Sequence, residues 1–188
     1  MKQAMINYMQ QEKNDELYTP DEAIIPILKY LDHNLIYWEC TDFGESNITK
    51  VLKENGFKVI HTSKREIDFL KDKANFEFDV IITNPPYSFK NDFLKKCYEY
   101  NKPFMLLLPL TALEGKERGK LYREKGIEVI VLDKRINFMK EKKNVWFNTS
   151  WFCHGICDKL LNFEKAGGED ESTKWYKKSN KKMCRSWK

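Results

Sequence analysis

The residues of this chain best suited to chemistry are Asn84, Pro85, Pro86 and Tyr87, which directly follow the strand-like run 79–83. The two prolines lack amide donors and stiffen the chain, so carbonyl oxygens of this loop are left without a local partner. Rigid hydrogen-bond acceptors beside an aromatic ring could hold a planar amino group and orient it for reaction. The same residues could also form an ordinary turn, because Asn-Pro dipeptides commonly end strands.

This loop resembles that of the class I S-adenosylmethionine-dependent methyltransferases that act on planar amino groups, above all the N6-adenine DNA methyltransferases. Their signature in this position is Asn/Asp-Pro-Pro-Tyr/Phe. The resemblance covers about residues 17–156 and looks closest to the small enzymes of phage genomes. It implies that Asn84 to Tyr87 are the catalytic residues. The Asn84 side-chain oxygen and the Pro85 carbonyl would each accept an N–H bond of the amine, and Tyr87 would stack on an adenine flipped out of the duplex.

The resemblance also implies where S-adenosyl-L-methionine would bind. The family usually has an acidic residue and a Gly-x-Gly turn after the first strand, which lets the backbone approach the cofactor. This chain has only one glycine there, Gly44, together with Glu39, Asp42 and Ser46. Ser46 stands in the place of the second glycine or caps the next helix. These four residues are the cofactor-binding candidates of the loop, and Asn84 borders the same site.

Two further segments match cofactor-binding elements of the family. Asp68 could accept a hydrogen bond from the cofactor's amino group and Phe69 could pack on its ring, although an exposed acid beside a core aromatic fits them equally well. Tyr18, Thr19 and Pro20 resemble the element that borders the methionine end. After the second predicted strand the family has an acidic partner for ribose hydroxyls, whereas here 62–64 reads Thr-Ser-Lys and Glu66 follows.

The elements that must position these residues alternate between strand and helix. Predicted strands, most of them continuously apolar as in strands covered on both faces, are 35–38, 57–61, 78–83, 102–110, 127–132 and 146–153. Predicted helices are 19–31, 47–55, 89–100 and 111–125, the last with a capping pair of Thr111 and Glu114. Such alternation predicts an α/β fold with a mostly parallel central sheet and helices on both faces. This is the Rossmann-like fold of class I methyltransferases.

The first of these helices has clear local signals. Thr19 is expected to cap it, Pro20 to occupy its first position and Glu22 to reach back to the cap. Pro26 cannot donate inside the helix, so a kink or break is expected there. The domain is predicted to span 1–163, with 1–18 as an arm, and 164–188 is expected to be a linker and tail.

The net charge of +5 is a property of the tail. Residues 173–188 hold seven basic side chains and no acid, which leaves 26 basic and 28 acidic groups elsewhere. Basic residues mixed with aromatics suit phosphate neutralisation and base stacking, although a solubilising end has the same composition. Arg135 and Phe138, after a predicted strand, could also contact a nucleotide or form a solvated turn with one buried ring. The nucleic-acid candidates, for DNA or possibly RNA, are Arg135, Phe138, Lys174, Trp175, Lys177, Lys178, Lys181, Lys182 and Arg185.

Several protein classes are disfavoured. No stretch approaches the roughly 20 apolar residues of a membrane span, and the first residues are polar rather than a signal core. A cytoplasmic protein is therefore expected, in the host cytoplasm if a phage encodes it. Five cysteines in a chain of this size favour reduced thiols over a disulfide framework. The spacing of Cys153, His154 and Cys157 is not that of a zinc knuckle, so no metal is predicted.

Two alternatives to an adenine DNA methyltransferase stay open. The same four residues, 84–87, occur in enzymes that methylate amino groups of RNA or the glutamine amide of a protein. The chain could also be a binding module on a methyltransferase scaffold, because Gly44 stands alone in the cofactor loop. Assays on DNA, RNA and protein side by side separate the acceptors, and calorimetry with S-adenosylhomocysteine tests the weakened site.

Deletion of residues 173–188 is expected to weaken nucleic-acid binding and to flatten its salt dependence, because seven positive charges are lost. Cofactor affinity should not change. Filter binding across about 50 to 200 mM salt measures the first effect, and calorimetry with S-adenosylhomocysteine measures the second. Unchanged binding and slope would show that the tail is only a solubilising end.

Overall fold

The computed structural model of the 188-residue chain describes residues 19–44, 46–138 and 148–167. These residues form one seven-stranded sheet in the order β2-β1-β3-β4-β6-β5-β7. All neighbouring strands are parallel except β6, which is antiparallel to both β4 and β5. The strands are β1 (Ile36–Glu39), β2 (Lys58–His61), β3 (Val80–Thr83), β4 (Phe104–Pro109), β5 (Glu128–Leu132), β6 (Thr149–His154) and β7 (Leu161–Glu164).

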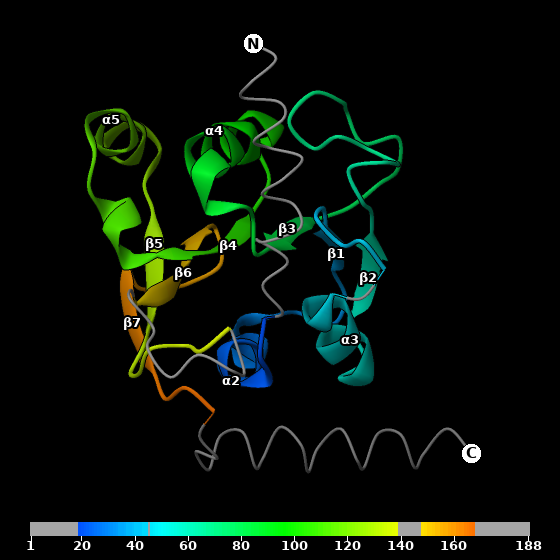
Figure 1. The fold of residues 1–188 in the computed structure, drawn as a ribbon, viewed down its shortest axis with the longest axis horizontal. Coiled ribbons are helices and arrows are strands. Elements are labelled where there is room, and N and C mark those ends of the chain that lie inside the picture. The colour runs from blue at the N-terminus through cyan, green and yellow to red at the C-terminus, as the bar shows by residue number, and fades with distance from the viewer. Residues whose placement is uncertain (1–18, 45, 139–147, 168–188) are drawn as a thin grey trace.

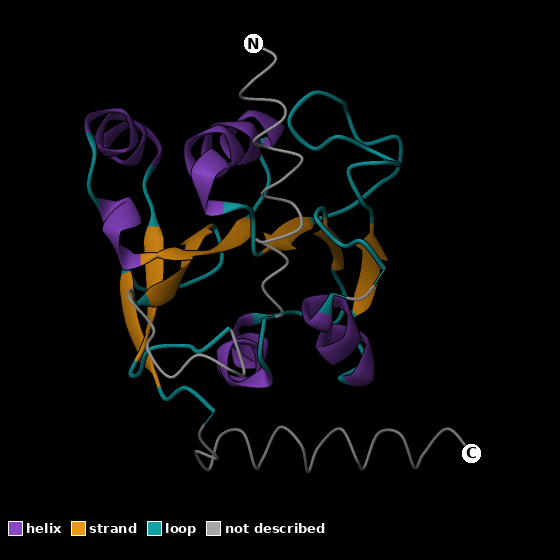
Figure 2. Cartoon of the chain, viewed as in Figure 1, coloured by secondary structure: helices purple, strands orange, loops and turns teal. Residues whose placement is uncertain are grey.

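Helices cover both faces of this sheet. Figure 1 shows α2 and α3 on one face and α4 and α5 on the other, and Figure 2 shows the strands as the layer between them. The helical elements are α2 (Asp21–Ile24), η1 (Ile25–Tyr30), α3 (Asn47–Glu54), η2 (Tyr87–Phe89), α4 (Lys90–Tyr100), η3 (Leu110–Leu113) and α5 (Lys116–Lys125). The predicted α/β fold with a mostly parallel sheet and helices on both faces is confirmed.

Alternate residues of the central strands enter two separate cores. In β4, Met105 and Leu107 join the core under α2 and α3, whereas Phe104, Leu106 and Leu108 join the core under α4 and α5. We call these the α2–α3 core and the α4–α5 core. Because side chains of a strand alternate between its faces, a strand buried on both faces must be apolar throughout. This explains why continuous apolarity predicted most of these strands.

The order of the strands fixes where a ligand can bind. From β1 the chain pairs with β2 on one side and then moves to the other side to form β3. In doubly wound sheets, ligands bind at the carboxyl ends of the strands where the order reverses in this way. The loops after β1 and β3 therefore flank the expected crevice.

The first predicted helix differs from expectation in its details. Pro20 occupies the N-cap position, and no side chain caps α2. The Glu22 carboxylate pairs with Lys134 at 2.6 Å rather than with the start of the helix. The break expected at Pro26 is confirmed, because α2 ends at Ile24 and the chain continues as the 3₁₀ helix η1.

The helix predicted over 111–125 is also interrupted. Its first residues form η3, and α5 begins only after Gly115, whose φ of +116° few other residues adopt. The Arg118 guanidinium donates to the carbonyl of Ala112 at 2.7 Å and to that of Glu114. These tertiary hydrogen bonds hold the turn and replace the predicted capping pair.

The sheet extends beyond its predicted end. β7 pairs in parallel with β5, and Ala166 is buried and donates to the Asp133 carboxylate at 2.8 Å. The Gly167 amide donates to the Glu22 carbonyl at 3.1 Å. Residues 164–167 are therefore part of the packed domain, which corrects the linker boundary predicted at 164. The predicted arm 1–18 and the residues after 167 lie outside the described part.

Two further observations concern membrane spans and the cysteines. None of the described helices is long and apolar enough to cross a membrane. Among the described residues the cysteines are free thiols, and no group of three His, Cys, Asp or Glu side chains is placed to hold a metal ion.

Leu107 in β4 is fully buried, and its replacement by alanine should destabilise the fold by about 2–5 kcal/mol through lost packing and a residual cavity. Leu160 is 73% exposed and provides a matched control, whose change to alanine should stay within about 0.5 kcal/mol. Urea denaturation measures both. Similar losses for the two variants would contradict the placement of Leu107 in the core.

Candidate functional site

Glu39 joins the loops after β1 and β3. Its side chain is buried, and its Oε1 accepts hydrogen bonds from the Thr41 amide at 3.0 Å, the Thr41 hydroxyl at 2.9 Å and the Thr83 hydroxyl at 2.6 Å. Its Oε2 accepts from the Ser46 hydroxyl at 3.3 Å. Burial raises the pKa of Glu39 to about 7, against the opposing effect of the threonine hydrogen bonds. The Glu39 carboxyl group therefore links the loop after β1 to the end of β3.

Asp42 organises the rest of the loop after β1. Its Oδ1 accepts from the amides of Gly44 at 2.6 Å and Ser46 at 3.0 Å, and its Oδ2 accepts from the Thr49 hydroxyl at 2.6 Å. His61 at the end of β2 lies 3.4 Å from the same Oδ2. Burial alone would raise the pKa of Asp42, but these hydrogen bonds and the nearby imidazole outweigh it and lower the pKa. Asp42 therefore remains a carboxylate that fixes the loop.

Gly44 leaves its side of the loop after β1 open. Its φ is +105°, a conformation that other residues rarely adopt, and an added Cβ would meet no atom within 4 Å. The space above Gly44 is therefore open. Ser46 precedes α3 at the N-cap position but makes no side-chain cap, because its hydroxyl is bonded to Glu39.

Asn84 lies at the carboxyl end of β3 with one half of its amide unused. Its Nδ2 donates to the Thr19 hydroxyl at 3.1 Å. Its Oδ1 is buried and has no hydrogen-bond partner among the described residues. A buried acceptor without a partner costs about 1–3 kcal/mol, so such groups call for an explanation.

The rest of the loop, Pro85 to Tyr87, continues from this acceptor into α4. Pro85 is buried, and no hydrogen bond between described residues ends on its carbonyl. The Pro86 carbonyl accepts from the Phe89 amide at 3.0 Å, and that of Tyr87 accepts from the Lys90 ammonium at 3.1 Å. The Tyr87 ring is half-buried against the α4–α5 core. Among the described residues, the Pro85 carbonyl therefore has no hydrogen-bond partner, whereas the carbonyls of Pro86 and Tyr87 each have one.

Thr19 connects the amino-terminal segment to this loop. It is buried, its hydroxyl meets Asn84, and its carbonyl accepts from the Asn47 side chain at 2.8 Å. Pro20 follows at the start of α2. The structure therefore brings Thr19 into contact with Asn84 and with the start of α3. The predicted contact of Thr19 and Pro20 with a cofactor stays a prediction. Tyr18 lies outside the described residues.

The cofactor candidates beyond β2 have structural roles of their own. The Asp68 carboxylate accepts from the Leu70 amide at 3.1 Å and pairs with Lys71 at 3.1 Å. The Phe69 ring is buried and stacks on Phe93, with centroids 5.0 Å apart. This is the core aromatic that the sequence left open as an alternative. The predicted contact of Asp68 and Phe69 with a cofactor stays a prediction.

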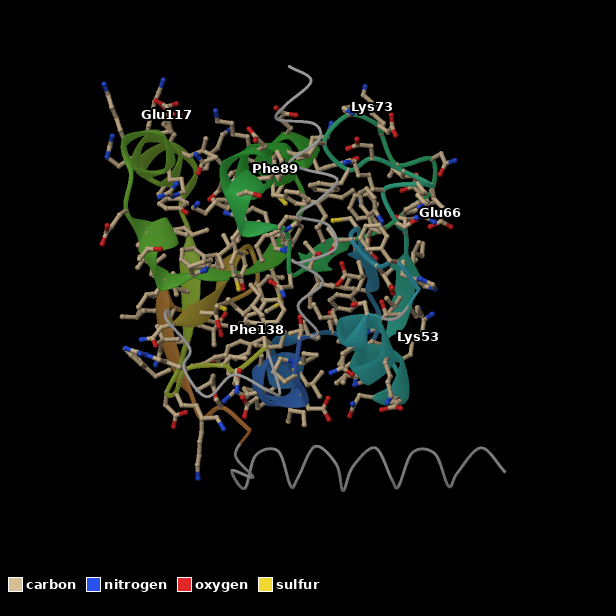
Figure 3. The ribbon with its side chains drawn as sticks, viewed as in Figure 1. Lys53, Glu66, Lys73, Phe89, Glu117 and Phe138 are labelled. Carbon is tan, nitrogen blue, oxygen red and sulfur yellow. The ribbon has the colours of Figure 1, made fainter. Side chains whose placement is uncertain are left out.

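The region that holds the ribose-binding acid in the family is arranged differently here. The Glu66 carboxylate accepts from the Ser63 amide at 2.8 Å and the Ser63 hydroxyl at 2.9 Å. These hydrogen bonds lower the pKa of Glu66. Figure 3 shows Glu66 beside β2 and away from α2. Glu66 therefore closes its own turn.

The two nucleic-acid candidates of the sheet edge follow β5. The Arg135 side chain donates to the Asn148 carboxamide at 3.0 Å and is exposed. Phe138 packs against the α2–α3 core, whereas Phe89 packs against the α4–α5 core, so they lie on opposite sides of the sheet (Figure 3). Phe138 is thus partly a core residue. The candidates Lys174, Trp175, Lys177, Lys178, Lys181, Lys182 and Arg185 lie outside the described residues.

Sequence reasoning missed three side chains that build the site. Thr41 in the loop after β1 and Thr83 at the end of β3, whose hydroxyls lie 2.5 Å apart, both hold Glu39. Asn47 at the start of α3 is buried and holds Thr19. An amide at the first position of a predicted helix was a visible signal for Asn47, whereas nothing local marked the threonines.

Comparison with known proteins leaves the function open. No protein-family model matches the sequence, and no curated protein matches it at a significant level. One similar solved structure is assigned as a modification subunit of a type I restriction enzyme from Vibrio vulnificus YJ016, with 12% sequence identity and a TM-score of 0.47. The match covers 94% of this chain and 56% of that subunit, so this chain spans little more than half of its length.

The buried Glu39 predicts a distinctive dependence of stability on pH. Its folded pKa of about 7 lies above the ordinary value of 4.5, so between these values the folded state binds more protons than the unfolded state. The contribution of this group is therefore present below about pH 4.5 and is lost as the pH rises through 7. Its full size is on the order of 3 kcal/mol.

Glutamine does not titrate, so the variant Glu39→Gln should not lose stability as the pH rises. Its free energy of unfolding relative to the wild type should therefore increase between pH 5 and pH 8, about the window set by these pKa values. Urea denaturation at intermediate pH values measures the difference. Asp42→Asn serves as the contrasting variant, because the pKa of Asp42 is lowered from 3.8 and its contribution to stability changes only below that pH, so the difference from the wild type should stay flat between pH 5 and pH 8. Parallel profiles for Glu39→Gln and the wild type would contradict the environment described for Glu39.

Proposed function

We propose that this protein transfers the methyl group of S-adenosyl-L-methionine to the exocyclic N6 amine of adenine in DNA. The observation that carries the proposal is the buried Asn84 Oδ1, which has no partner among the described residues. It lies in the Asn-Pro-Pro-Tyr loop at the carboxyl end of β3, beside the reversal of strand order where doubly wound sheets bind ligands.

The chemistry of an aromatic amine explains why such an acceptor is needed. The lone pair of the N6 nitrogen is delocalised into the adenine ring, so the amine is a poor nucleophile. Asn84 Oδ1 and the Pro85 carbonyl would each accept one of its two N–H bonds and favour a pyramidal nitrogen whose lone pair is localised. Tyr87 would stack on the base, which must leave the duplex to reach this pocket.

The residues present fit a cofactor beside this amine. The open space above Gly44 admits a ligand close to the backbone, and Asp42 keeps this loop in place. Gly44 and Ser46 would line the methionine side, and Asp68 would face the adenine side. When bound, S-adenosylmethionine supplies an electrophilic methyl group. A rigid loop that aligns the amine with it could supply up to roughly 7–11 kcal/mol of the barrier reduction.

DNA as the acceptor is supported by composition rather than by described geometry. Arg135 is exposed at the carboxyl edge, and the seven basic side chains of 173–188 alternate with aromatic residues. Such mixtures bind phosphates and stack on bases. The protein would act on DNA in the cytoplasm.

Asn84→Ala should lower the rate of methyl transfer to adenine by about 10²–10³-fold, as expected when one preorganised group that stabilises a transition state is removed. Asn84→Asp keeps an acceptor oxygen and should retain more activity. Asn162→Ala provides a matched control, because this side chain lies on β7 and, within the described part of the chain, its amide group donates to the Lys159 carbonyl alone. The assay follows labelled methyl groups from the cofactor into unmethylated genomic DNA.

Three parallel measurements make the result decisive. A duplex of G·C pairs alone should accept no methyl group, and mass spectrometry of the nucleosides should find N6-methyladenine. RNA and protein extract, tested side by side, identify another acceptor if one exists. Calorimetry with S-adenosylhomocysteine should show micromolar binding. Absent cofactor binding, or no transfer to adenine in DNA, would overturn the proposal.

A further inference from the structure

Thr19 occupies an unusual position between the cofactor loop and the proposed catalytic amide. It lies before α2, 65 residues away from Asn84 in sequence, and its hydroxyl is 3.1 Å from the Asn84 Nδ2. Its carbonyl accepts from Asn47 Nδ2 at 2.8 Å. We propose, resting on the function above, that Thr19 is a positioning residue that holds Asn84 with its Oδ1 toward the amine, and that Asn47 fixes Thr19.

The two ends of the Asn84 amide are chemically opposite. Oδ1 only accepts hydrogen bonds, whereas Nδ2 carries two N–H donors. With Nδ2 on Thr19, the crevice receives an acceptor that suits an amine. With the amide turned over, the buried position now held by Oδ1 would be occupied by the NH₂ group, with two donors that lack partners. Buried unpaired N–H groups are rarer than buried unpaired carbonyls. A threonine hydroxyl can accept from Nδ2 or donate to Oδ1. The Thr19 contact therefore holds the amide in place, and the cost of two unpaired donors favours the orientation that presents an acceptor to an N–H group.

Asn47 makes this contact rigid. It is buried at the first position of α3, and its Nδ2 donates both to the Thr19 carbonyl at 2.8 Å and to the Asp21 carboxylate at 2.8 Å. Both N–H bonds of this amide are thus used. Thr19 cannot shift without breaking a buried hydrogen bond, which costs about 1–3 kcal/mol. The chain from α3 through Thr19 to Asn84 links the cofactor loop to the acceptor loop.

The arrangement has a consequence for substrate choice. An acceptor oxygen attracts the amino group of adenine and repels the carbonyl oxygens of other bases. An amide free to turn over would present donors for part of the time and would lose this preference. Thr19 would therefore act on turnover and on the discrimination of amino from carbonyl groups, without itself touching the reacting atoms.

The test compares Thr19→Val, which keeps the shape but lacks the hydroxyl, with Thr19→Ser, which keeps the hydroxyl. In the full-length protein, Thr19→Val should lower kcat for adenine methylation about tenfold, the cost of one hydrogen bond. Its KM for S-adenosylmethionine should stay unchanged. Thr19→Ser should restore kcat to within about threefold of the wild type. A raised KM for the cofactor at unchanged kcat would overturn the proposal and make Thr19 a cofactor contact.

A second measurement does not depend on activity. In NMR spectra of the ¹⁵N-labelled protein, the Asn84 side-chain NH₂ pair, assigned by its loss in Asn84→Asp, should shift in Thr19→Val and return toward its wild-type position in Thr19→Ser. If the wild type methylates nothing, the proposed function fails, yet this spectrum still decides the positioning role. An Asn84 signal that is unchanged in Thr19→Val would overturn the positioning role even in an active enzyme.

Asn47→Leu extends the test to the anchor. It removes both donors at similar size, so it should reduce kcat as Thr19→Val does, and the double variant should lose little more than either single one. Urea denaturation confirms that each variant is folded at the assay temperature. Losses that simply multiply in the double variant would show that Asn47 acts independently of Thr19, which would overturn its place in the proposal.

Discussion

The carboxyl ends of β1 and β3 are held together by one buried carboxyl group. Glu39 ends β1 and holds the hydroxyls of Thr41 and Thr83, so it joins the two loops that flank the reversal of strand order. Removing a carboxylate from water is expensive unless several donors replace the solvent. The raised pKa shows that the donors here only partly compensate. Through Thr83, the residue before Asn84, this group ties the loop after β1 to the end of β3.

The sheet explains why the polar residues gather where they do. The central strands bury apolar side chains on both faces, in the α2–α3 core and the α4–α5 core. The faces of β3 and β4 therefore have no room for chemistry. Only the strand ends leave the cores, and in a mostly parallel sheet the ends of β1, β3 and β4 meet at one edge. Glu39, Thr83 and Asn84 lie at that edge because of this constraint.

Features encoded by neighbouring residues could be predicted from the sequence, whereas contacts between distant residues could not. Continuous apolarity identified β3 and β4, and the Asn-Pro-Pro-Tyr loop was placed at a strand end because its motif and its strand are contiguous. β7 was missed because its Leu161 and Phe163 alternate with polar residues on an exposed edge. Thr19 appeared to be a helix cap, but a residue 65 positions away binds its hydroxyl. No local pattern contains such a contact.

The single glycine of the loop after β1 illustrates how a motif can change and its geometry remain. Gly44 alone takes the positive φ, and the carboxylate of Asp42 accepts from the amides of Gly44 and Ser46. The Asp42 side chain thus stabilises the turn in a chain that lacks the second glycine of the family motif. The same bonds commit these two amides to Asp42, so they are not free to bind an anion. A ligand in this loop would meet the bare Cα of Gly44, and its polar contacts would have to come from other elements.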